Sequence, residues 1–518
     1  MVQIFQKQIF NNKLNFIIFI LLLFSGILMA SLNNSIIDDA YISFRYSENL
    51  IEGNGLVYNE GEYVEGYSNF LWVLIIAFFM KLGLDPTIIS KLLGLFFFSG
   101  SIIFSYLLSI KIFEKDKNKF LYSLLTIVML VFNCSLIYFA TTGLEHSLFI
   151  FLLLFSSYFM FINKNPYIGN FGFVLLILTR NEGGLFYIFA NIFYYLLINQ
   201  NKKQTKIYIN SFILSLLSLL LYEIWRIIYY GSIFPNTFYA KATVISLFDG
   251  FKYFYGYLIS YPILIFLIPF MIYAMFQKKR IIQFFIVSSI FYIIYLVKMG
   301  GDFMAYRLIT QIFPLLLISG IFGYVSFSKK YVRNKNLNYL LLIIMFLLVF
   351  TSFVFGEKYT DVSLDLDILN IQKHSNWEEV GKKLNQINFP KNTSIAITAA
   401  GAIPYYSKLY TLDMLGLTDA TISRQKQTNA RPGHKKQATY DYLLEKEINF
   451  IIGHPQTMEC VNACNNDGYD WFMPKEVFES QKVFLIMNNT HCFRMFYLTK
   501  SFELDNFLNN NINIKVCN

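Results

Sequence analysis

The sequence predicts an α-helical, polytopic membrane protein with about 11 to 13 transmembrane helices and a C-terminal α/β domain. Of its 518 residues, 55% are hydrophobic and only 15% are charged, and the mean hydropathy is +0.46. Such a composition is typical of the membrane class and not of soluble multidomain proteins. We therefore expect a transmembrane domain over residues 1–356 and a separate domain over residues 357–518, where the long apolar runs stop.

Two sets of apolar runs lie in the first part of the chain. Those long enough to cross a bilayer, which takes roughly 17 to 25 residues, cover about residues 14–32, 87–110, 120–140, 205–229, 257–277, 281–298, 307–327 and 337–356. Shorter runs cover 67–83, 143–162, 168–180 and 184–199. Because no small-residue cleavage site follows the first run, we expect it to remain as an anchor.

Basic residues gather in short loops between the runs: Lys202, Lys203 and Lys206; Lys278, Lys279 and Arg280; Lys329, Lys330, Arg333 and Lys335. The net charge of +10 therefore reflects the positive-inside rule and not nucleic-acid binding. We expect these loops in the cytosol, and the first loop and the C-terminal domain on the opposite side. The lysines at 111–119 also predict a cytosolic loop, which requires that one run within residues 67–110 is only partial.

The loop after the first run, residues 33–66, is acidic. Around it, residues 37–70 carry seven acids and the single base Arg45. We expect a short helix from Ala40 to about Ile51 that lies along the membrane surface, with Asp39 at its N-cap and Gly53 after its end. Asp38 and Asp39 would then meet the lipid-water boundary, where they could act as a general base and its electrostatic partner or could simply cap the helix.

Other ionisable residues lie at the ends of apolar runs, where a charge is costly unless it meets a cavity, a partner or a ligand. Arg180 could bind a phosphate through charge-assisted hydrogen bonds, or it could pair with Glu182 and brace a bend at Gly183 and Gly184. The same reasoning selects Glu145, His146, Arg226, Lys241, Asp302 and Arg307. Each of them could also be an interfacial side chain that extends to water.

The C-terminal domain alternates helical and strand patterns. Strands are predicted at 394–398, 448–453, 482–487 and 493–499, and helices at 376–387 and 438–446. Cys460, Cys464, Cys492 and Cys517 predict one or two disulfides in an oxidising compartment, with the pairing open. His454 and His491 leave a zinc site open, although the spacing matches no standard zinc pattern. No P-loop, dinucleotide fingerprint, GxSxG or HExxH motif supports nucleotide-driven chemistry or the common hydrolytic mechanisms.

Six strings occur in order between residue 37 and about residue 436: DDAYISFRYSENLIEGNGLVYNEGEYVEGYSNFLW, TTGLEHSLF, LTRNEGGLF, WRIIYYGSIFPNTFYAK, GGDFMAYR, and GAIPYYSKLYTLDMLGLTDATISR followed by PGHKK. Together they resemble polytopic GT-C glycosyltransferases, most closely the bacterial arabinofuranosyltransferases of mycobacterial arabinan and of pilin glycosylation. Asn181 stands where that family commonly has a proline, which affects only the local bend.

The resemblance implies an enzyme of the bacterial cytoplasmic membrane whose active site and C-terminal domain face the periplasm. It implies transfer of a sugar from a polyprenyl phosphate to a hydroxyl of an envelope glycan, lipid or protein, usually with inversion. The resemblance suggests arabinofuranose as that sugar. The general base would be Asp38, with Asp39 beside it. The donor phosphate would meet Arg180, Arg226, Lys241 and Arg307, supported by Glu145, His146, Glu182 and Asp302. The acceptor would meet Tyr405, Tyr406, Asp413 and His434.

Two other functions remain open from the sequence. A flippase or transporter of lipid-linked sugars would explain the spans and the charged residues, but not the acidic interfacial helix or the large outer domain. A non-enzymatic envelope assembly protein would need no ionisable groups at the span ends. No cofactor is indicated, and the sequence leaves open whether a divalent cation assists, which sugar and acceptor are used, and the oligomeric state.

Overall fold

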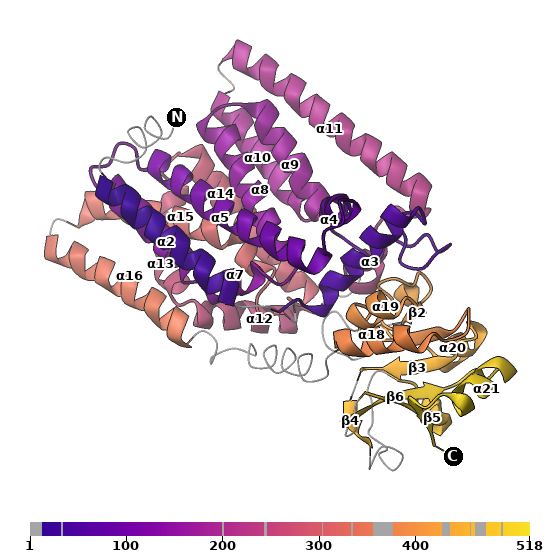
Figure 1. Cartoon of the computed structure of the whole chain (residues 1–518). Helices are drawn as coiled ribbons and strands as arrows, with labels where there is room; N and C mark the ends of the chain where they lie inside the picture. The colour runs from indigo at the N-terminus through magenta and orange to yellow at the C-terminus, as the bar shows by residue number, and fades with distance from the viewer. Residues whose placement is uncertain are drawn as a thin grey trace.

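The computed structural model describes residues 13–32, 35–198, 201–242, 246–302, 304–332, 335–355, 377–426, 436–455, 457–460, 473–487 and 491–517. It consists of a helical bundle and a smaller C-terminal domain that lies beside one end of the bundle, with helix α3 between them (Figure 1). The predicted domain boundary at residue 357 lies outside the described residues.

The bundle contains helices long and apolar enough to cross a membrane: α2 (Lys13–Leu32), α5 (Pro86–Ile112), α11 (Lys202–Tyr230), α14 (Arg280–Met299), and α15 (Phe313–Tyr331) with the preceding turn η3 (Ile309–Ile312). Helices α12 (Leu247–Ser260) and α13 (Ile263–Met275) pass the same test as a pair bent by 101°. Other helices complete the described bundle: α4 (Phe70–Lys81), α6 (Lys119–Val131), α7 (Cys134–Phe139), α8 (His146–Ser157) with η1 (Tyr158–Ile162), α9 (Pro166–Thr179), α10 (Gly183–Ile198), η2 (Phe238–Ala242) and α16 (Lys335–Phe355). The chain is thus a multi-pass membrane protein.

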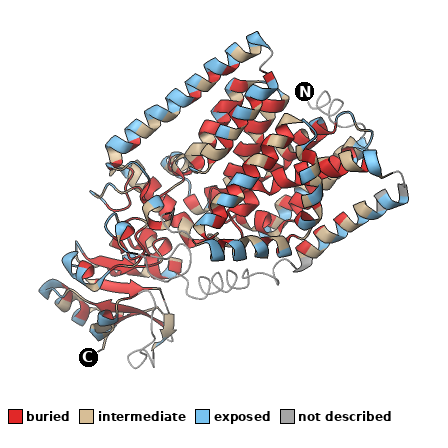
Figure 2. Cartoon of the chain, turned by 180° about the vertical axis from the view of Figure 1, so that it is seen from behind, coloured by how far each residue is buried: buried red, intermediate tan, exposed pale blue. Residues whose placement is uncertain are grey.

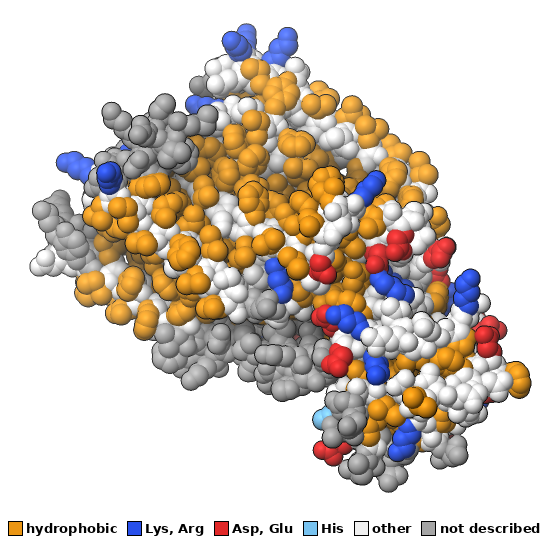
Figure 3. Space-filling view, viewed as in Figure 1, with side chains coloured by type: hydrophobic (Ala, Val, Ile, Leu, Met, Phe, Trp, Pro, Cys, Tyr) orange, Lys and Arg blue, Asp and Glu red, His pale blue; other side chains and the backbone are white. Residues whose placement is uncertain are grey.

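The surface of the bundle is apolar. Helix α11 runs along its outer edge and exposes leucines and isoleucines such as Leu214, Leu221 and Ile228, whereas the central helices are buried (Figure 2). Hydrophobic side chains cover the flank of the bundle, and charged side chains gather at the far end and at the junction with the C-terminal domain (Figure 3). This distribution suits a hydrocarbon layer around the bundle with polar regions at both ends.

Of the two apolar runs within residues 67–110, the one that forms helix α4 is the shorter. Its 12 residues span about 18 Å, which is shorter than the roughly 30 Å hydrocarbon core. At one end of α5, Lys91 interacts electrostatically with Glu378 of the C-terminal domain. At the other end, Lys279 Nζ donates a hydrogen bond to the carbonyl oxygen of Ile112 at 2.6 Å. The loop after α5 therefore lies on the same face as the basic loop at 278–280, as its lysines predicted.

Helix α3 (Asp38–Glu52) differs from the expectation at its start. Ile37 occupies the N-cap position and no side chain caps the helix, so the predicted capping role of Asp39 is wrong. Both aspartates instead lie in the first turn, where their charge favours the helix dipole. At the other end the helix stops at Gly53 as predicted, in a left-handed conformation with φ of 91°.

The C-terminal domain is built on one mixed sheet with the order β2-β1-β3-β6-β5-β7, and β4 also pairs with β6. Its strands are β1 (Ser394–Ile397), β2 (Tyr410–Asp413), β3 (Phe450–Gly453), β4 (Thr457–Glu459), β5 (Gln481–Ile486), β6 (His491–Tyr497) and β7 (Ile514–Val516). Strand β1 is parallel to β2 and β3, and the other pairs are antiparallel. The described helical segments are α18 (Trp377–Ile387), α19 (Ala402–Ser407), η4 (Ile422–Arg424), α20 (Tyr440–Glu445), η6 (Lys475–Glu479) and α21 (Phe502–Asn510). The predicted α/β class is confirmed.

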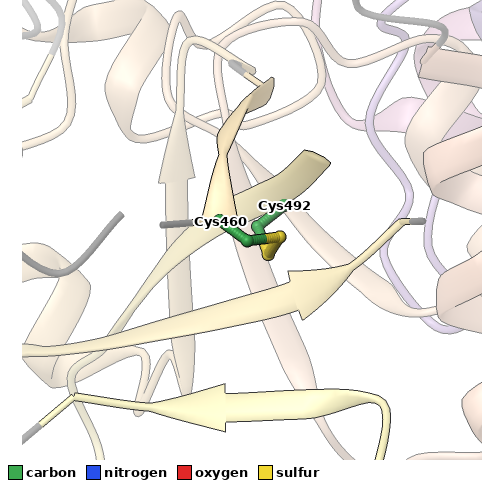
Figure 4. Close-up of a disulfide and its surroundings, with 2 residues drawn as sticks. All are labelled: Cys460 and Cys492. Carbon is green, nitrogen blue, oxygen red and sulfur yellow. A yellow bond between two sulfur atoms is a disulfide. The ribbon is translucent and has the colours of Figure 1, made fainter. Parts of the chain in front are cut away.

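A disulfide joins Cys460, at the end of β4, to Cys492 in β6 (Figure 4). This pairing was open from the sequence, and Cys464 lies outside the described residues. Within the ranges given above, no group of three or more His, Cys, Asp or Glu side chains is arranged to hold a metal ion. His454 instead packs edge-on against the ring of Trp377, with ring centroids 5.7 Å apart.

Candidate active site

A cavity of about 670 Å³ lies where the bundle, the first loop and the C-terminal domain meet. Helix α3 contributes Asp39, Ile42 and Ser43 to its wall, and the C-terminal domain contributes Leu417. The remaining wall comes from residues 66–69, the starts of α8 and α10, the ends of α9, α11 and α14, and the segments 233–241 and 301–308. All six of the strings quoted above therefore contribute to the cavity wall, and the sixth contributes only the apolar side chain of Leu417.

Three arginines in the cavity wall each bridge two carboxylates. Arg180 binds Glu145 at 2.6 Å and Glu182 at 3.0 Å. Arg226 binds Glu65 at 2.8 Å and Glu223 at 2.7 Å. Arg307 binds Asp302 at 2.9 Å and lies 3.5 Å from a carboxylate oxygen of Asp39. Since a buried guanidinium is costly unless its charge is matched, these carboxylates hold the arginines in fixed orientations beside the cavity.

Lys241, the fourth predicted phosphate ligand, is different. It lines the cavity from η2, and among the described residues it has no hydrogen-bond or ion-pair partner. Burial lowers the pKa of Lys241, and the charges of Asp39 and Asp302 oppose that shift. Its ammonium group is therefore available to an anionic ligand in the cavity.

The two adjacent aspartates face different surroundings. Asp39 lines the cavity, and its side chain is 29% exposed. Asp38 is 8% exposed and does not belong to the cavity wall. Its carboxylate accepts hydrogen bonds from the backbone N–H groups of Gly401 at 3.0 Å and Ala402 at 2.8 Å, at the start of α19. Burial raises the pKa of Asp38 to about 7, although these two hydrogen bonds lower it.

Some of the predicted supporting residues line the cavity and others lie behind its wall. Glu145 and Glu182 line the cavity, and Glu145 also accepts a hydrogen bond from Asn69 Nδ2 at 2.9 Å. His146 does not belong to the wall of this cavity. It is buried beside Phe139 and lies 3.4 Å from the hydroxyl of Thr310. The sequence analysis passed over Asn69 and Glu223, because a single asparagine or an exposed glutamate at the end of a span carries no pattern of its own.

The predicted acceptor residues lie outside the cavity wall. The rings of Tyr405 and Tyr406 pack against Tyr41 of α3, with centroids 5.6 and 5.5 Å apart. Asp413 is buried and accepts hydrogen bonds from the backbone of Leu415, Leu417 and Thr418, and burial raises its pKa to about 6. His434 lies outside the described residues. The three described residues join the C-terminal domain to the first loop or shape the loop that carries Leu417.

The bundle, the cavity and the domain beside it define a polytopic membrane protein of the GT-C fold with a C-terminal α/β domain. Two solved structures of ArnT from Cupriavidus metallidurans are similar to most of the chain. The apo structure has a TM-score of 0.54 at 11% identity, and the structure bound to undecaprenyl phosphate has a TM-score of 0.56 at 9% identity. Each comparison covers 92% of this chain and 97% of the ArnT chain. At these identities the likeness shows the fold alone.

Sequence comparisons add one match. A family described as a domain of unknown function (DUF8728) matches residues 369–496, which lie in the C-terminal domain. No curated protein matches the chain. The predicted GT-C fold is therefore confirmed by structure, while the closeness to arabinofuranosyltransferases stays a prediction.

Proposed function

We propose that this protein is a membrane glycosyltransferase that moves a sugar from a polyprenyl phosphate to a hydroxyl of an envelope glycan, lipid or protein, with inversion. The observation that carries the proposal is a single cavity whose wall contains a carboxylate, Asp39, together with the cations Lys241 and Arg307. The ArnT fold, and the undecaprenyl phosphate bound in one ArnT structure, support a lipid phosphate as the donor. The resemblance of the sequence strings makes arabinofuranose the first sugar to test.

The charges of the cavity suit this reaction. The acceptor hydroxyl would give its proton to the Asp39 carboxylate while its oxygen attacks the anomeric carbon, and the bond from that carbon to the phosphate oxygen would break. The leaving polyprenyl phosphate gains negative charge, which Lys241 can neutralise because no described carboxylate pairs with it. Arg180, Arg226 and Arg307, already held by their carboxylates, would add donors of fixed direction.

The geometry favours Asp39 over Asp38 as the general base. A base must reach the proton that it accepts, and Asp39 lines the cavity whereas Asp38 is engaged with the backbone of α19. In this proposal Asp38 joins the catalytic loop to the C-terminal domain. Tyr405, Tyr406 and Asp413 would act on the acceptor only indirectly, through the loop that carries Leu417.

The proposed site faces the periplasm of the bacterial cytoplasmic membrane. The cavity and the C-terminal domain lie at the end of the bundle opposite the basic loops, which the positive-inside rule assigns to the cytosol. The disulfide between Cys460 and Cys492 supports an oxidising compartment for that domain. A lipid-linked donor fits this side of the membrane, because nucleotide sugars are cytosolic substrates.

The test is donor turnover by purified protein in detergent, with decaprenyl-phosphate arabinofuranose as donor and an oligosaccharide acceptor. Asp39→Asn is expected to lower transfer at least about a thousandfold while undecaprenyl phosphate still binds, because the proton acceptor is lost and the shape is kept. Binding of the lipid phosphate without turnover by the wild type, across pentose and hexose donors, would favour the flippase. Chelation in the same assay tests dependence on a divalent cation.

A further inference from the structure

The segment from Gly231 to Ala242, here called the strap, forms one side of the cavity and carries Lys241. Its cavity-lining residues are Ile233, Phe234, Pro235, Thr237, Phe238 and Lys241. Asn236 lies in the middle of this set but does not line the cavity, and only 5% of it is exposed. Its side chain contacts the C-terminal domain instead.

Both polar atoms of the Asn236 side-chain amide form hydrogen bonds with the C-terminal domain. Nδ2 donates to the carbonyl oxygens of Gly416 and Leu417 at 2.9 Å each. The carbonyl oxygen of Asp419 lies 3.1 Å from the same Nδ2. Oδ1 accepts from the hydroxyl of Ser423 at 2.7 Å and from Arg424 Nη1 at 3.3 Å. A side chain that donates and accepts at once is required here, and an amide meets that requirement.

The groups that Asn236 meets are themselves fixed. The carboxylate of Asp413 holds the backbone of the loop around Gly416, which has a φ of 77°. On the bundle side, the backbone N–H of Asn236 donates to the carbonyl oxygen of Glu65 at 3.0 Å, and the carboxylate of Glu65 binds Arg226. Asn236 therefore links the strap to the first loop and to the C-terminal domain at once. Two further strap residues contact Arg424 of that domain: Ser232 accepts a hydrogen bond at 3.2 Å, and the guanidinium lies 4.3 Å from the ring centroid of Tyr239.

We infer that Asn236 is a positioning residue: it fixes the strap against the C-terminal domain so that Lys241 faces the donor phosphate. This inference rests on the proposed function, because Lys241 has this role only if the cavity binds a lipid phosphate. It assigns the C-terminal domain a share in donor binding, although that domain places only Leu417 in the described wall of the cavity.

The experiment compares full-length protein in lipid nanodiscs by amide hydrogen exchange and by affinity for undecaprenyl phosphate. The variants are Asn236→Ala, Lys241→Ala and the double variant. The matched control is Asn59→Ala, because Asn59 is also buried at this joint and exchanges two hydrogen bonds with the backbone of Thr411 but does not touch the strap. Ser423→Ala removes one donor to Asn236 and serves if Asn236→Ala fails to fold.

Exchange in residues 232–242 is expected to become at least about tenfold faster in Asn236→Ala and to stay unchanged in Asn59→Ala, because buried hydrogen bonds are lost only in the first. Affinity for undecaprenyl phosphate should fall about tenfold in Asn236→Ala and in Lys241→Ala, and no further in the double variant, since both losses act through one contact. With Ser423→Ala the same changes should be smaller, about threefold.

Two results would overturn the inference: unchanged exchange in the strap of Asn236→Ala, or losses of affinity that multiply to about a hundredfold in the double variant. A wild-type protein that does not bind undecaprenyl phosphate would contradict the proposed function. In that case the exchange measurement, which needs no ligand, still decides whether Asn236 holds the strap.

Discussion

At the scale of single residues, the main finding is that neighbouring charges of one type have different partners. Asp38 and Asp39 are adjacent, yet one binds the backbone of α19 and the other faces the cavity. Successive residues in a helix point about 100° apart, so adjacent carboxylates cannot share one environment. Helix α3 begins at Asp38, two positions earlier than predicted, so both aspartates lie within its first turn.

The sequence allows two interpretations of Arg180. The structure shows that Arg180 pairs with two carboxylates and not with one. It binds Glu145 as well as Glu182, so exchanging Arg180 and Glu182 cannot restore the native arrangement. We expect Arg180→Glu to lower donor turnover by about two to three orders of magnitude, because its charge stabilises the leaving phosphate. The double variant Arg180→Glu/Glu182→Arg should remain as inactive as Arg180→Glu in a donor-consumption assay.

The control is the amount of folded protein recovered by size-exclusion chromatography, which should match the wild type in the double variant. Recovery of most activity by that variant would assign Arg180 to scaffolding alone, because a carboxylate at position 180 cannot bind the donor phosphate.

At the scale of elements, α3 is a shared element and not a helix that lies free on the membrane surface. Its Tyr41 and Phe44 pack against α19, and Arg45 donates to the carbonyl oxygens of Tyr58, Pro404 and Leu409 at 2.7, 2.8 and 2.9 Å. The amphipathic pattern correctly predicted a helix with one apolar face. It did not reveal that the C-terminal domain covers that face, because a pattern gives the buried side and not the partner.

The joint between α3 and α19 should depend on Asp38. In Asp38→Asn one of the two acceptors is replaced by an N–H donor that faces a backbone N–H, so we expect a loss of roughly 1 to 3 kcal/mol in the free energy of unfolding. Gly401→Ala should act in the same direction, since a Cβ there would lie 2.0 Å from the carbonyl oxygen of Asp38. Thermal unfolding in detergent measures both.

The pH dependence gives this prediction a second readout. The pKa of Asp38 is raised from 3.8 to about 7 in the folded protein, so the folded state holds the proton more tightly than the unfolded state. The contribution of Asp38 to the free energy of unfolding is therefore present in full below about pH 4 and is lost as the pH rises through 7. The part of the wild-type thermal stability that comes from Asp38 should fall between about pH 4 and 7, and Asp38→Asn should show a shallower fall. An equal slope in both proteins would contradict this linkage.

At the scale of the whole molecule, the sequence predicted the fold class and most strands of the sheet, while the side of the membrane on which the basic loops lie stays a prediction. The strings that it singled out line the cavity, which agrees with the need of an arginine or glutamate at the end of an apolar span for a partner there. The sequence did not predict which residues of these strings face the cavity and which hold other residues in place. Asn236, for example, contacts the backbone carbonyl of Gly416, which is 180 residues away in the sequence, and residue type alone does not locate such a group.

The arrangement of the whole chain leads to a prediction of topology. Lys279 and Ile112 meet at one end of the bundle, and Lys329 pairs with Asp116 there, so three basic loops share one face. The C-terminal domain lies at the opposite end, against α3 (Figure 1).

Because basic loops stay in the cytosol, a reporter that is active only in the cytosol should be silent when it is fused after Asn518 and active when it is inserted near Lys279. A periplasm-specific reporter at the same positions should give the reverse. Cytosolic activity after Asn518 would place the cavity on the side where nucleotide sugars are available, and the lipid-phosphate donor would then lose its rationale.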